Sequence, residues 1–303
     1  MHQNLLTLEE ITHNDLREVF KLSQEYKENR GRVFPKPLEG KSIGMIFSKS
    51  STRTRVSFDV GIYELGGHGL YMEESKMQVG RGETIADTAC VLSRYLHGIV
   101  IRTFKHSDVV ELAKHSRIPV INALTDEFHP CQTISDLFTI HELSDSLEGV
   151  KITYLGDGAS NMANSLILAA KFAGMELIIS SPHDYQPRKD LMDKELGHGS
   201  ATWEPDPVKA VENAAYLYTD VWVSMGFEDE SAERVKKLKP YQLNMQLLRN
   251  AAPDAKVMHC LPAHREEEIT SEVVDSPQSI VLDQAENRLH VQKAILTMMI
   301  GQN

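Results

Sequence analysis

Five consecutive residues, Ser51-Thr52-Arg53-Thr54-Arg55, combine three hydroxyl groups with two guanidinium groups. An apolar stretch typical of a strand, Ser42–Phe47, comes shortly before them, and a segment typical of a helix follows. The first turn of a helix presents backbone N–H groups and the positive end of the helix dipole, and arginine adds a planar fork that matches phosphate oxygens. The run therefore predicts a site for a phosphate-bearing small molecule. The alternative is a capped surface helix with two solvated arginines.

Other polar side chains also follow apolar, strand-like runs. They are Arg102, His129–Gln132, Asp157–Asn164, Ser224–Gly226 and His259–His264. In open parallel sheets, ligands bind beyond the carboxyl ends of the strands. We therefore expect these residues to converge on one cleft between two domains.

Two of these positions allow both a structural and a chemical interpretation. Arg102 ends the run Gly98–Arg102, where it is either solvated or in contact with the ligand. His129 is either a structural loop histidine or a donor that polarises a carbonyl group. Pro130 fixes the backbone beside it, and Thr133 is the expected N-cap of the next helix.

Asp220 lies in an apolar run that we expect to be a strand over Tyr216–Val223, and Ser224, four residues after Asp220, directly follows that run. Alternation then places both side chains on one face of the sheet. A buried aspartate is costly unless it is paired. Its partner is either a ligand ammonium group or a structural group such as a lysine or a backbone N–H.

Two short motifs resemble well-known sites but lack part of the pattern. Gly156-Asp157-Gly158 lacks the third glycine of a dinucleotide-binding turn, so hydrogen bonding to a zwitterion is the preferred interpretation. The run from His259 to His264 offers two histidines and Cys260, but the second pair of spaced ligands that a structural zinc site needs is missing. We therefore interpret Cys260 as a thiol beside a ligand amine.

The elements that must position these residues alternate between strand and helix along almost the whole chain. Alternation of this kind predicts parallel sheets with helices on both faces, and hence an α/β fold with two domains. The first domain is expected to span residues 1–146, with the last helix, 285–303, packing back on it, and the second to span residues 147–284. In the helix after Ser51, apolar residues recur about one turn apart at Val56, Val60 and Tyr63.

Composition narrows the class of protein. The net charge of −11, from 43 acidic and 32 basic residues, argues against electrostatic binding to nucleic acid or to an anionic membrane. Three cysteines are too few and odd in number for a disulfide framework, which fits the reducing cytoplasm. Neither a signal peptide nor a membrane-spanning run is visible. An anionic ligand would need a local cationic pocket in an acidic protein.

Taken together, four motifs resemble those of the ornithine carbamoyltransferase family, in the same order and over nearly the whole chain. They are the Ser51–Arg55 run, His129-Pro130-Cys131-Gln132, Asp220 with Ser224-Met225-Gly226, and His259-Cys260-Leu261-Pro262. The first would also fit the aspartate-using relatives, whereas the other three favour the ornithine branch.

The resemblance implies transfer of the carbamoyl group of carbamoyl phosphate to the δ-amine of L-ornithine, giving citrulline and phosphate. It implies catalytic roles for Arg102, His129 and Cys260. The implied carbamoyl phosphate-binding residues are Ser51, Thr52, Arg53, Thr54, Gln78, Arg102, His129, Gln132, Cys260, Leu261 and Arg288. The implied ornithine-binding residues are Asn161, Asp220, Ser224 and Met225.

The same resemblance implies a cytoplasmic enzyme of arginine metabolism that needs no metal or cofactor. It also implies a homotrimer, or a multiple of trimers, in which Gln78 reaches into the site of a neighbouring subunit. Two alternatives stay open at this point. One is a carbamoyltransferase for another amine, such as N-acetylornithine, putrescine or lysine, and the other is a non-catalytic anion-binding protein on the same fold.

Overall fold

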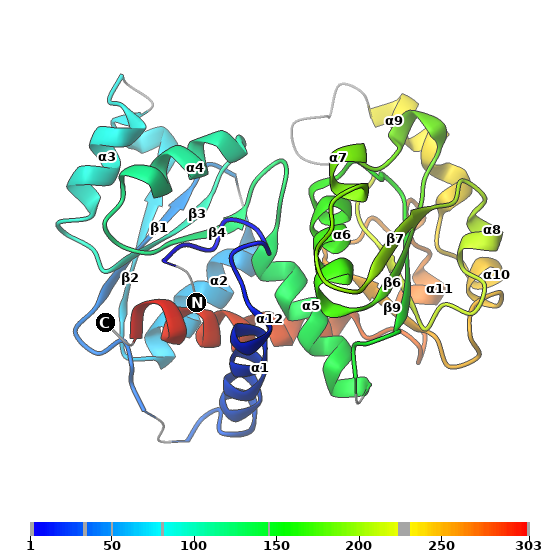
Figure 1. Ribbon diagram of the computed structural model, residues 1–303, viewed down its shortest axis with the longest axis horizontal. Helices are drawn as coiled ribbons and strands as arrows, with labels where there is room; N and C mark the ends of the chain where they lie inside the picture. The colour runs from blue at the N-terminus through cyan, green and yellow to red at the C-terminus, as the bar shows by residue number, and fades with distance from the viewer. Residues whose placement is uncertain are drawn as a thin grey trace. The chain divides into compact units, whose positions relative to one another are not determined.

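The computed structural model describes residues 3–32, 35–49, 51–79, 82–144, 146–223 and 231–301. The chain forms two compact units, one of Met1–Phe138 with Glu286–Asn303 and one of Thr139–Ala285. It passes from the first unit to the second inside α5 (Pro130–Leu143) and returns inside α12 (Val281–Leu296) (Figure 1). The division therefore falls within a helix, whereas the sequence places the domain boundary beyond its end.

The first unit is built on a parallel four-stranded sheet in the order β2-β1-β3-β4. Its strands are β1 (Ser42–Phe47), β2 (His68–Glu73), β3 (Gly98–Arg102) and β4 (Val120–Leu124). Its helices, besides those shared with the second unit, are α1 (His13–Glu28), α2 (Thr52–Glu64), the short η1 (Glu74–Lys76), α3 (Ile85–Leu92), α4 (His106–His115) and the terminal η6 (Thr297–Gly301).

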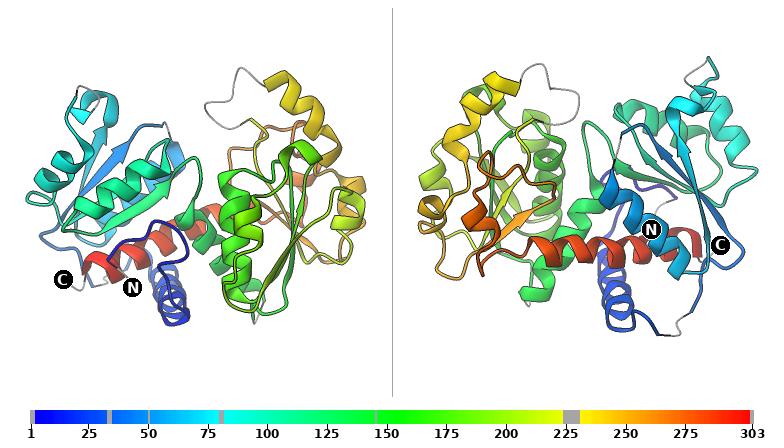
Figure 2. Two further views of the ribbon diagram at one scale, coloured as in Figure 1. Left: turned by 45° about the horizontal axis from the view of Figure 1, so that its top comes forward. Right: turned by 180° about the vertical axis from the view of Figure 1, so that it is seen from behind.

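Helices cover both faces of this sheet, as Figure 2 shows. Ile46 and Ile101 share a buried cluster with Leu112 of α4, on one face. On the other face, Met45 of β1 and Ile62 of α2 both lie against Gly69. The end of the chain also belongs here, because Gly61 of α2 lies against Leu289 and Lys293 of α12.

The second unit contains a parallel five-stranded sheet in the order β7-β6-β5-β8-β9. Its strands are β5 (Lys151–Leu155), β6 (Glu176–Ser180), β7 (Ser200–Trp203), β8 (Tyr216–Thr219) and β9 (Lys256–His259). Its helices are α6 (Asn161–Ala173), η3 (His183–Tyr185), α7 (Lys189–Met192), α8 (Pro207–Ala210), α9 (Ser231–Leu238), η5 (Lys239–Tyr241), α10 (Met245–Leu248) and α11 (Ser271–Val274). The predicted α/β class with two parallel sheets is confirmed.

Two local predictions are wrong. The strand β8 ends at Thr219 and not at Val223, because its ladder with β9 stops at the pair Thr219 and His259. Helix α5 begins at Pro130, so Thr133 lies inside the helix, where its hydroxyl donates to the His129 carbonyl. Proline is favoured in a first helical turn because that turn leaves N–H groups unused.

The apolar residues that recur along α2 are not the ones that it buries. Val56 and Tyr63 are 52% and 80% exposed, and Phe58 and Ile62 are the residues that α2 buries. The sequence prediction did not name α1, the edge strand β7 or the helices between β6 and α12. Within the described residues, no helix is both long and apolar enough to cross a bilayer.

Candidate active site

The sequence run that follows β1 forms the beginning of α2. Ser51 is the N-cap, and its hydroxyl accepts a hydrogen bond from the backbone N–H of Thr54 across 3.2 Å. The first turn of α2 contains no acidic residue that would neutralise the positive end of its dipole. The local structure is therefore the helix N-terminus that the sequence predicts for an anion site.

Two arginines from distant parts of the chain meet at Thr54. Its hydroxyl oxygen accepts a hydrogen bond from Arg288 Nη2 across 2.7 Å and a longer one from Arg102 Nη1 across 3.4 Å. Arg102 ends β3, Arg288 belongs to α12, and all three residues are buried. Buried positive charges are costly unless an anion compensates them, so this cluster, which we call the Thr54 cluster, is suited to a phosphate group.

His129 lies close to the same two arginines. It precedes α5, and its carbonyl accepts hydrogen bonds from the backbone N–H groups of Gln132 and Thr133. Burial, and then the charges of Arg288 and Arg102, hold the pKa of the His129 imidazole well below its ordinary value of 6.5. The ring is therefore neutral at physiological pH and can donate a hydrogen bond without carrying a charge.

The two residues after Pro130 differ in character. Gln132 donates from Nε2 to Asp136 across 2.8 Å, and among the described residues its buried Oε1 has no hydrogen-bond partner. Cys131 donates to the carbonyl of Asn122, and burial raises the pKa of its thiol to about 12. Gln132 thus retains an acceptor for a ligand, whereas Cys131 is a structural thiol.

The other predicted residues of this unit lie in the first turn of α2 and after η1. Thr52 is exposed and Arg53 half-buried, both in the first turn of α2. The second guanidinium of the motif, on Arg55, stacks on the Tyr71 ring at 3.8 Å and so faces β2. Gln78 is exposed in the segment after η1.

In the second unit, the central observation is a thiol that faces a carboxylate. Asp220 and Cys260 directly follow the last paired residues of β8 and β9, Thr219 and His259. The register therefore places them side by side, and Cys260 Sγ donates to Asp220 Oδ1 across 2.9 Å. The same oxygen accepts the backbone N–H of Val221 across 2.7 Å.

Burial raises the pKa of the Asp220 carboxyl above its ordinary value of 3.8. A further polar group lies nearby on β5, since the charge of Asp220 is the second cause, after burial, of the raised pKa of Tyr154. The Tyr154 hydroxyl in turn contacts the hydroxyl of Ser160, the N-cap of α6, across 3.0 Å. Asn161 is the first residue of that helix, so Asn161, Asp220 and Cys260 follow three neighbouring strands.

Sequence reasoning missed the group that holds the Cys260 loop. His259 Nε2 lies 2.9 Å from Glu268 Oε1, and both side chains are fully buried. The other ring nitrogen accepts the backbone N–H of Leu261 across 2.9 Å, which leaves the proton on Nε2. Leu261 has a left-handed φ of 55°, and the peptide bond to Pro262 is cis. The proximity of Glu268 to the motif, nine residues on, was the only available signal.

A second missed residue is Arg234 of α9. It forms a buried ion pair with Asp157, donates from Nε to the carbonyl of Trp222 across 3.0 Å, and stacks on Tyr185. Arg234 and Trp222 flank residues 224–230, and the predicted ligands Ser224 and Met225 lie there, outside the described residues.

Asp220, His259 and Cys260 also have the types and spacing of a metal-binding group. Both ring nitrogens of His259 are already used, one by Glu268 and one by Leu261, and the thiol is used by Asp220. These three side chains are therefore occupied by protein partners in this structure.

Comparison with known proteins decides the family. The carbamoyl-P binding domain of the aspartate/ornithine carbamoyltransferases matches residues 3–142, and the Asp/Orn binding domain matches residues 148–299. The chain belongs to the aspartate/ornithine carbamoyltransferase family. As in the other members of this family, it is a carbamoyl-group transferase, which confirms the predicted family and enzyme class.

Individual relatives of the carbamoyltransferase are similar over nearly their full length. An ornithine carbamoyltransferase from Syntrophus aciditrophicus is 51% identical, over 99% of this chain and 100% of its own length. One from Oceanobacillus iheyensis is 50% identical, over 99% of this chain and 94% of its own length. The solved ornithine carbamoyltransferase from Pyrococcus furiosus has a TM-score of 0.93 at 45% identity, covering 99% of this chain and 97% of its own.

Proposed function

We propose that this carbamoyltransferase moves the carbamoyl group of carbamoyl phosphate to the δ-amine of L-ornithine, giving L-citrulline and phosphate. The observation that carries the choice of amine is the Cys260–Asp220 pair at the ends of β9 and β8. A buried carboxylate suits the α-ammonium group of an amino acid, and the thiol beside it suits an approaching amine. The relatives at about 50% identity that are ornithine carbamoyltransferases support the same assignment.

Carbamoyl phosphate is assigned to the first unit. Its phosphate would lie at the N-terminus of α2, held by Ser51, Thr52, Arg53 and the hydroxyl of Thr54. Arg102 and Arg288 would supply charge, since both already donate to Thr54. The carbonyl oxygen would accept a hydrogen bond from neutral His129, and Gln132 would accept one from the carbamoyl nitrogen through its Oε1.

Ornithine is assigned to the second unit. Asp220 would hold the α-ammonium group, with Asn161, Ser224 and Met225 around the amino-acid head. Cys260 and Leu261 would border the δ-amine. Putrescine has no α-carboxylate and N-acetylornithine has no free α-ammonium group, so neither would use this set of residues fully.

The reaction needs only proton transfer and electrostatic stabilisation. A free alkyl amine has a pKa of about 10.4, and removal from water lowers that value, so the bound amine can lose its proton. Its lone pair attacks the carbonyl carbon, a C–N bond forms, the C–O bond to phosphate breaks, and an amine proton leaves with the phosphate. Arg102 and His129 would stabilise the oxyanion, and a single donor of this kind contributes about 3–4 kcal/mol.

The test is citrulline formation from carbamoyl phosphate with a panel of amines: L-ornithine, N-acetylornithine, putrescine and L-lysine. We expect L-ornithine to have the highest kcat/KM. A preference for another amine would overturn the substrate assignment, and binding of carbamoyl phosphate without turnover of any amine would favour the non-catalytic alternative. Arg53→Leu is expected to abolish carbamoyl phosphate binding in calorimetry.

We also propose a homotrimer with shared sites. Val56, Tyr63 and Leu70 are 52%, 80% and 44% exposed on α2 and on the edge strand β2, and a second copy of the chain would cover them. Gln78 is exposed and free to reach a neighbour. Light scattering should give about three times the chain mass of 34.1 kDa, or a multiple of that. A monomer in solution would contradict this assembly.

Hybrid enzymes test whether the sites are shared. A Gln78→Ala chain and an Arg102→Leu chain, each inactive alone, are dissociated, mixed and reassembled. If Gln78 serves the neighbour's site, about a quarter of the sites in random hybrids combine two intact residues. Recovery of activity to that level supports sharing, and hybrids as inactive as the parents would overturn it.

A cytoplasmic role in arginine metabolism, with no metal or cofactor, completes the proposal. Cys90, Cys131 and Cys260 are not joined in disulfides, which suits a reducing compartment. Full activity after dialysis against a chelator is the expected result, and loss of activity that added metal restores would contradict it.

A further inference from the structure

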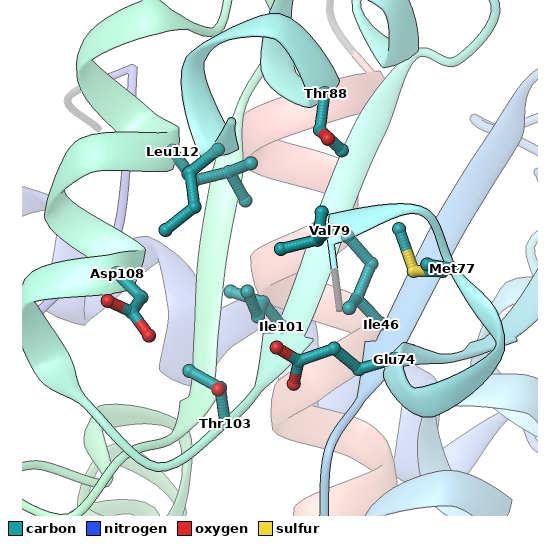
Figure 3. Close-up of a pocket in the computed structure, with 10 residues that line it drawn as sticks. Ile46, Glu74, Met77, Val79, Thr88, Ile101, Thr103, Asp108 and Leu112 are labelled. Carbon is teal, nitrogen blue, oxygen red and sulfur yellow. The ribbon is translucent and has the colours of Figure 1, made fainter. Parts of the chain in front are cut away.

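A cavity of about 50 Å³ lies in the first unit, between β1, β3, α3 and α4 (Figure 3). Its apolar walls include Ile46 and Ile101, which belong to one buried cluster of the core. Its polar groups are apart, with Thr88 at one end and Glu74 and Asp108 toward the other. A ligand small enough for this space would not contact both ends, and the cavity is part of the core.

In the second unit, by contrast, two hydroxyl groups meet beside the proposed ornithine site. Oη of Tyr154, on β5, lies 3.0 Å from Oγ of Ser160, the N-cap of α6. The same Ser160 oxygen accepts the backbone N–H of Ala163 across 3.1 Å. Among the residues that the structure describes, Tyr154 and Ala163 are the two hydrogen-bond partners of the Ser160 hydroxyl.

Burial decides which of the two hydroxyls donates. Tyr154 is 1% exposed, whereas Ser160 is half-buried. If Ser160 donated to Tyr154, the phenol proton would stay inside the unit with no acceptor among the described residues, which is costly. Tyr154 also keeps its proton, because burial and then the charge of Asp220 raise its pKa well above 10.0. The phenol therefore donates to Ser160.

This direction leaves the proton of Ser160 for a ligand. A serine hydroxyl has two lone pairs and one proton. Its lone pairs accept the O–H of Tyr154 and the N–H of Ala163, so the proton is directed away from both. A hydroxyl that accepts a hydrogen bond also becomes a stronger donor. Ser160 is thus an oriented donor at the half-buried start of α6.

The position of this donor matches the head group of an amino acid. Tyr154 pairs in register with Tyr218, two residues before Asp220, and the charge of Asp220 reaches the phenol. An amino acid carries its α-ammonium and α-carboxylate groups on one carbon, so a partner for the carboxylate must lie near the partner of the ammonium group. Asp220 would repel the carboxylate, whereas a hydroxyl can donate to it.

We propose that the Ser160 hydroxyl donates a hydrogen bond to the α-carboxylate of the amino-acid substrate, and that Tyr154 is the positioning residue that orients this hydroxyl. The inference rests on the proposed function and deepens it. It gives the site a reason to prefer L-ornithine over putrescine, which has no α-carboxylate.

The experiment measures steady-state kinetics with L-ornithine and inhibition constants for two analogues, at saturating carbamoyl phosphate and constant ionic strength. L-Norvaline has the amino-acid head group, and butylamine differs from it only by lacking the carboxylate. Ser160→Gly removes the hydroxyl and leaves a residue that is tolerated as an N-cap. KM for L-ornithine and the L-norvaline constant should rise about tenfold, because a hydrogen bond to a charged group is lost. The butylamine constant and kcat should stay unchanged.

Three further variants separate the two roles. Tyr154→Phe removes the orienting O–H and should weaken L-norvaline severalfold. Tyr216→Phe is the matched control, because Tyr216 begins the neighbouring strand β8, at the opposite end of the sheet, and pairs with the Ser144 hydroxyl across 2.8 Å. It should leave both inhibition constants unchanged. Ser160→Thr keeps a hydroxyl and should restore most of the affinity for L-norvaline.

Unchanged kinetics of Ser160→Gly would overturn the proposal, and so would equal weakening of butylamine and L-norvaline, which would indicate a general disturbance of the unit. Equal effects of Tyr154→Phe and Tyr216→Phe would exclude Tyr154 as the positioning residue. Circular dichroism checks that each variant is folded, and Tyr154→Phe provides an independent test if Ser160→Gly does not fold. A parent enzyme that does not use L-ornithine would contradict the proposed function itself, so the two failures are distinguishable.

Discussion

The thiol of Cys260 donates a hydrogen bond to the carboxylate of Asp220 across 2.9 Å, from residues that directly follow the paired ends of β9 and β8. Further hydrogen bonds fix both groups. Asp220 accepts one from the backbone N–H of Val221, and the Cys260 loop is bonded to His259, which is itself paired with Glu268. The structure thus fixes the positions of both groups, and the proposal that they contact an amine substrate can be tested at each of them.

Cys260→Ser is expected to lower kcat/KM for L-ornithine about 10- to 100-fold with little change in carbamoyl phosphate affinity. Serine can still donate to Asp220, but its oxygen is smaller and holds its proton more tightly, so proton exchange with the amine suffers. Steady-state kinetics with each substrate varied in turn measure the effect. Cys90→Ser, at an exposed thiol, is the control. Unchanged ornithine kinetics would show that Cys260 does not contact the amine.

The raised pKa of Asp220 predicts a pH limit on ornithine binding. Because burial raises this pKa above 3.8, the carboxylate is protonated on acidification earlier than an ordinary aspartate, and the affinity for L-norvaline, which has the same head group, should fall there. The folded state binds this proton more tightly than the unfolded state, so the cost to stability begins as the pH rises above 3.8 and is complete above the raised pKa. Asp220→Asn should therefore lose the norvaline site but unfold at a higher temperature at pH 7.

Calorimetry across pH and thermal unfolding measure these two effects. A variant that is less stable than the parent at pH 7, or norvaline affinity that is independent of pH down to 4, would contradict a buried, ligand-accessible carboxylate.

Much of this arrangement follows from the sequence because parallel strands bring their ends together. The strand-end rule placed Arg102 and Cys260 correctly at the carboxyl ends of β3 and β9, whereas Asp220, which was predicted to lie inside a strand, directly follows β8. It could not give the strand order, and the pairing of Asp220 with Cys260 depends on β8 lying next to β9. Adjacency of strands is set by packing over the whole sheet, which local periodicity does not encode.

Contacts between distant segments are the part that the sequence alone could not supply. Nothing in the local sequence of Arg288 marks it as a partner of Thr54, 234 residues earlier, and only the family resemblance pointed to it. Helix α1, by contrast, could have been predicted from the sequence, since Thr12 and Asp15 form a capping box and Leu16, Val19 and Phe20 recur on one face. The sequence of α2 does not show which of its apolar residues are buried, because an exposed apolar residue and a core residue have the same hydrophobicity.

His129 is expected to stay neutral across the working pH range. With its pKa held well below 6.5 by burial and by Arg288 and Arg102, its ring resonances in histidine-labelled protein should not titrate near pH 6.5. The unfolded chain binds a proton on the His129 imidazole more tightly than the folded chain, so the protein should lose stability as the pH falls below 6.5. The His129→Gln variant should lose less stability over the same pH range. A His129 resonance, assigned by that variant, with a midpoint near 6.5 would contradict a neutral donor.

Arg288→Met is expected to weaken binding of a phosphonate analogue of carbamoyl phosphate by about 10²- to 10³-fold, as loss of one preorganised charged donor does. Arg55→Met is the matched control from the same motif, since Arg55 stacks on Tyr71 and is exposed. Calorimetry gives both affinities. Equal effects of the two substitutions would show that the Thr54 cluster does not define the anion site.

Arg234→Met is expected to destabilise the second unit by about 3–5 kcal/mol, because it leaves the buried Asp157 carboxylate without its partner. The same substitution releases the carbonyl of Trp222, just before the segment with Ser224 and Met225, so KM for ornithine should rise more than kcat falls. Arg188→Met removes an exposed ion pair with Asp190 in the same unit and should cost at most about 1 kcal/mol. Denaturant unfolding and steady-state kinetics measure both effects. If Arg234→Met were as mild as Arg188→Met, Arg234 would contribute neither to the stability of the second unit nor to the proposed binding of ornithine.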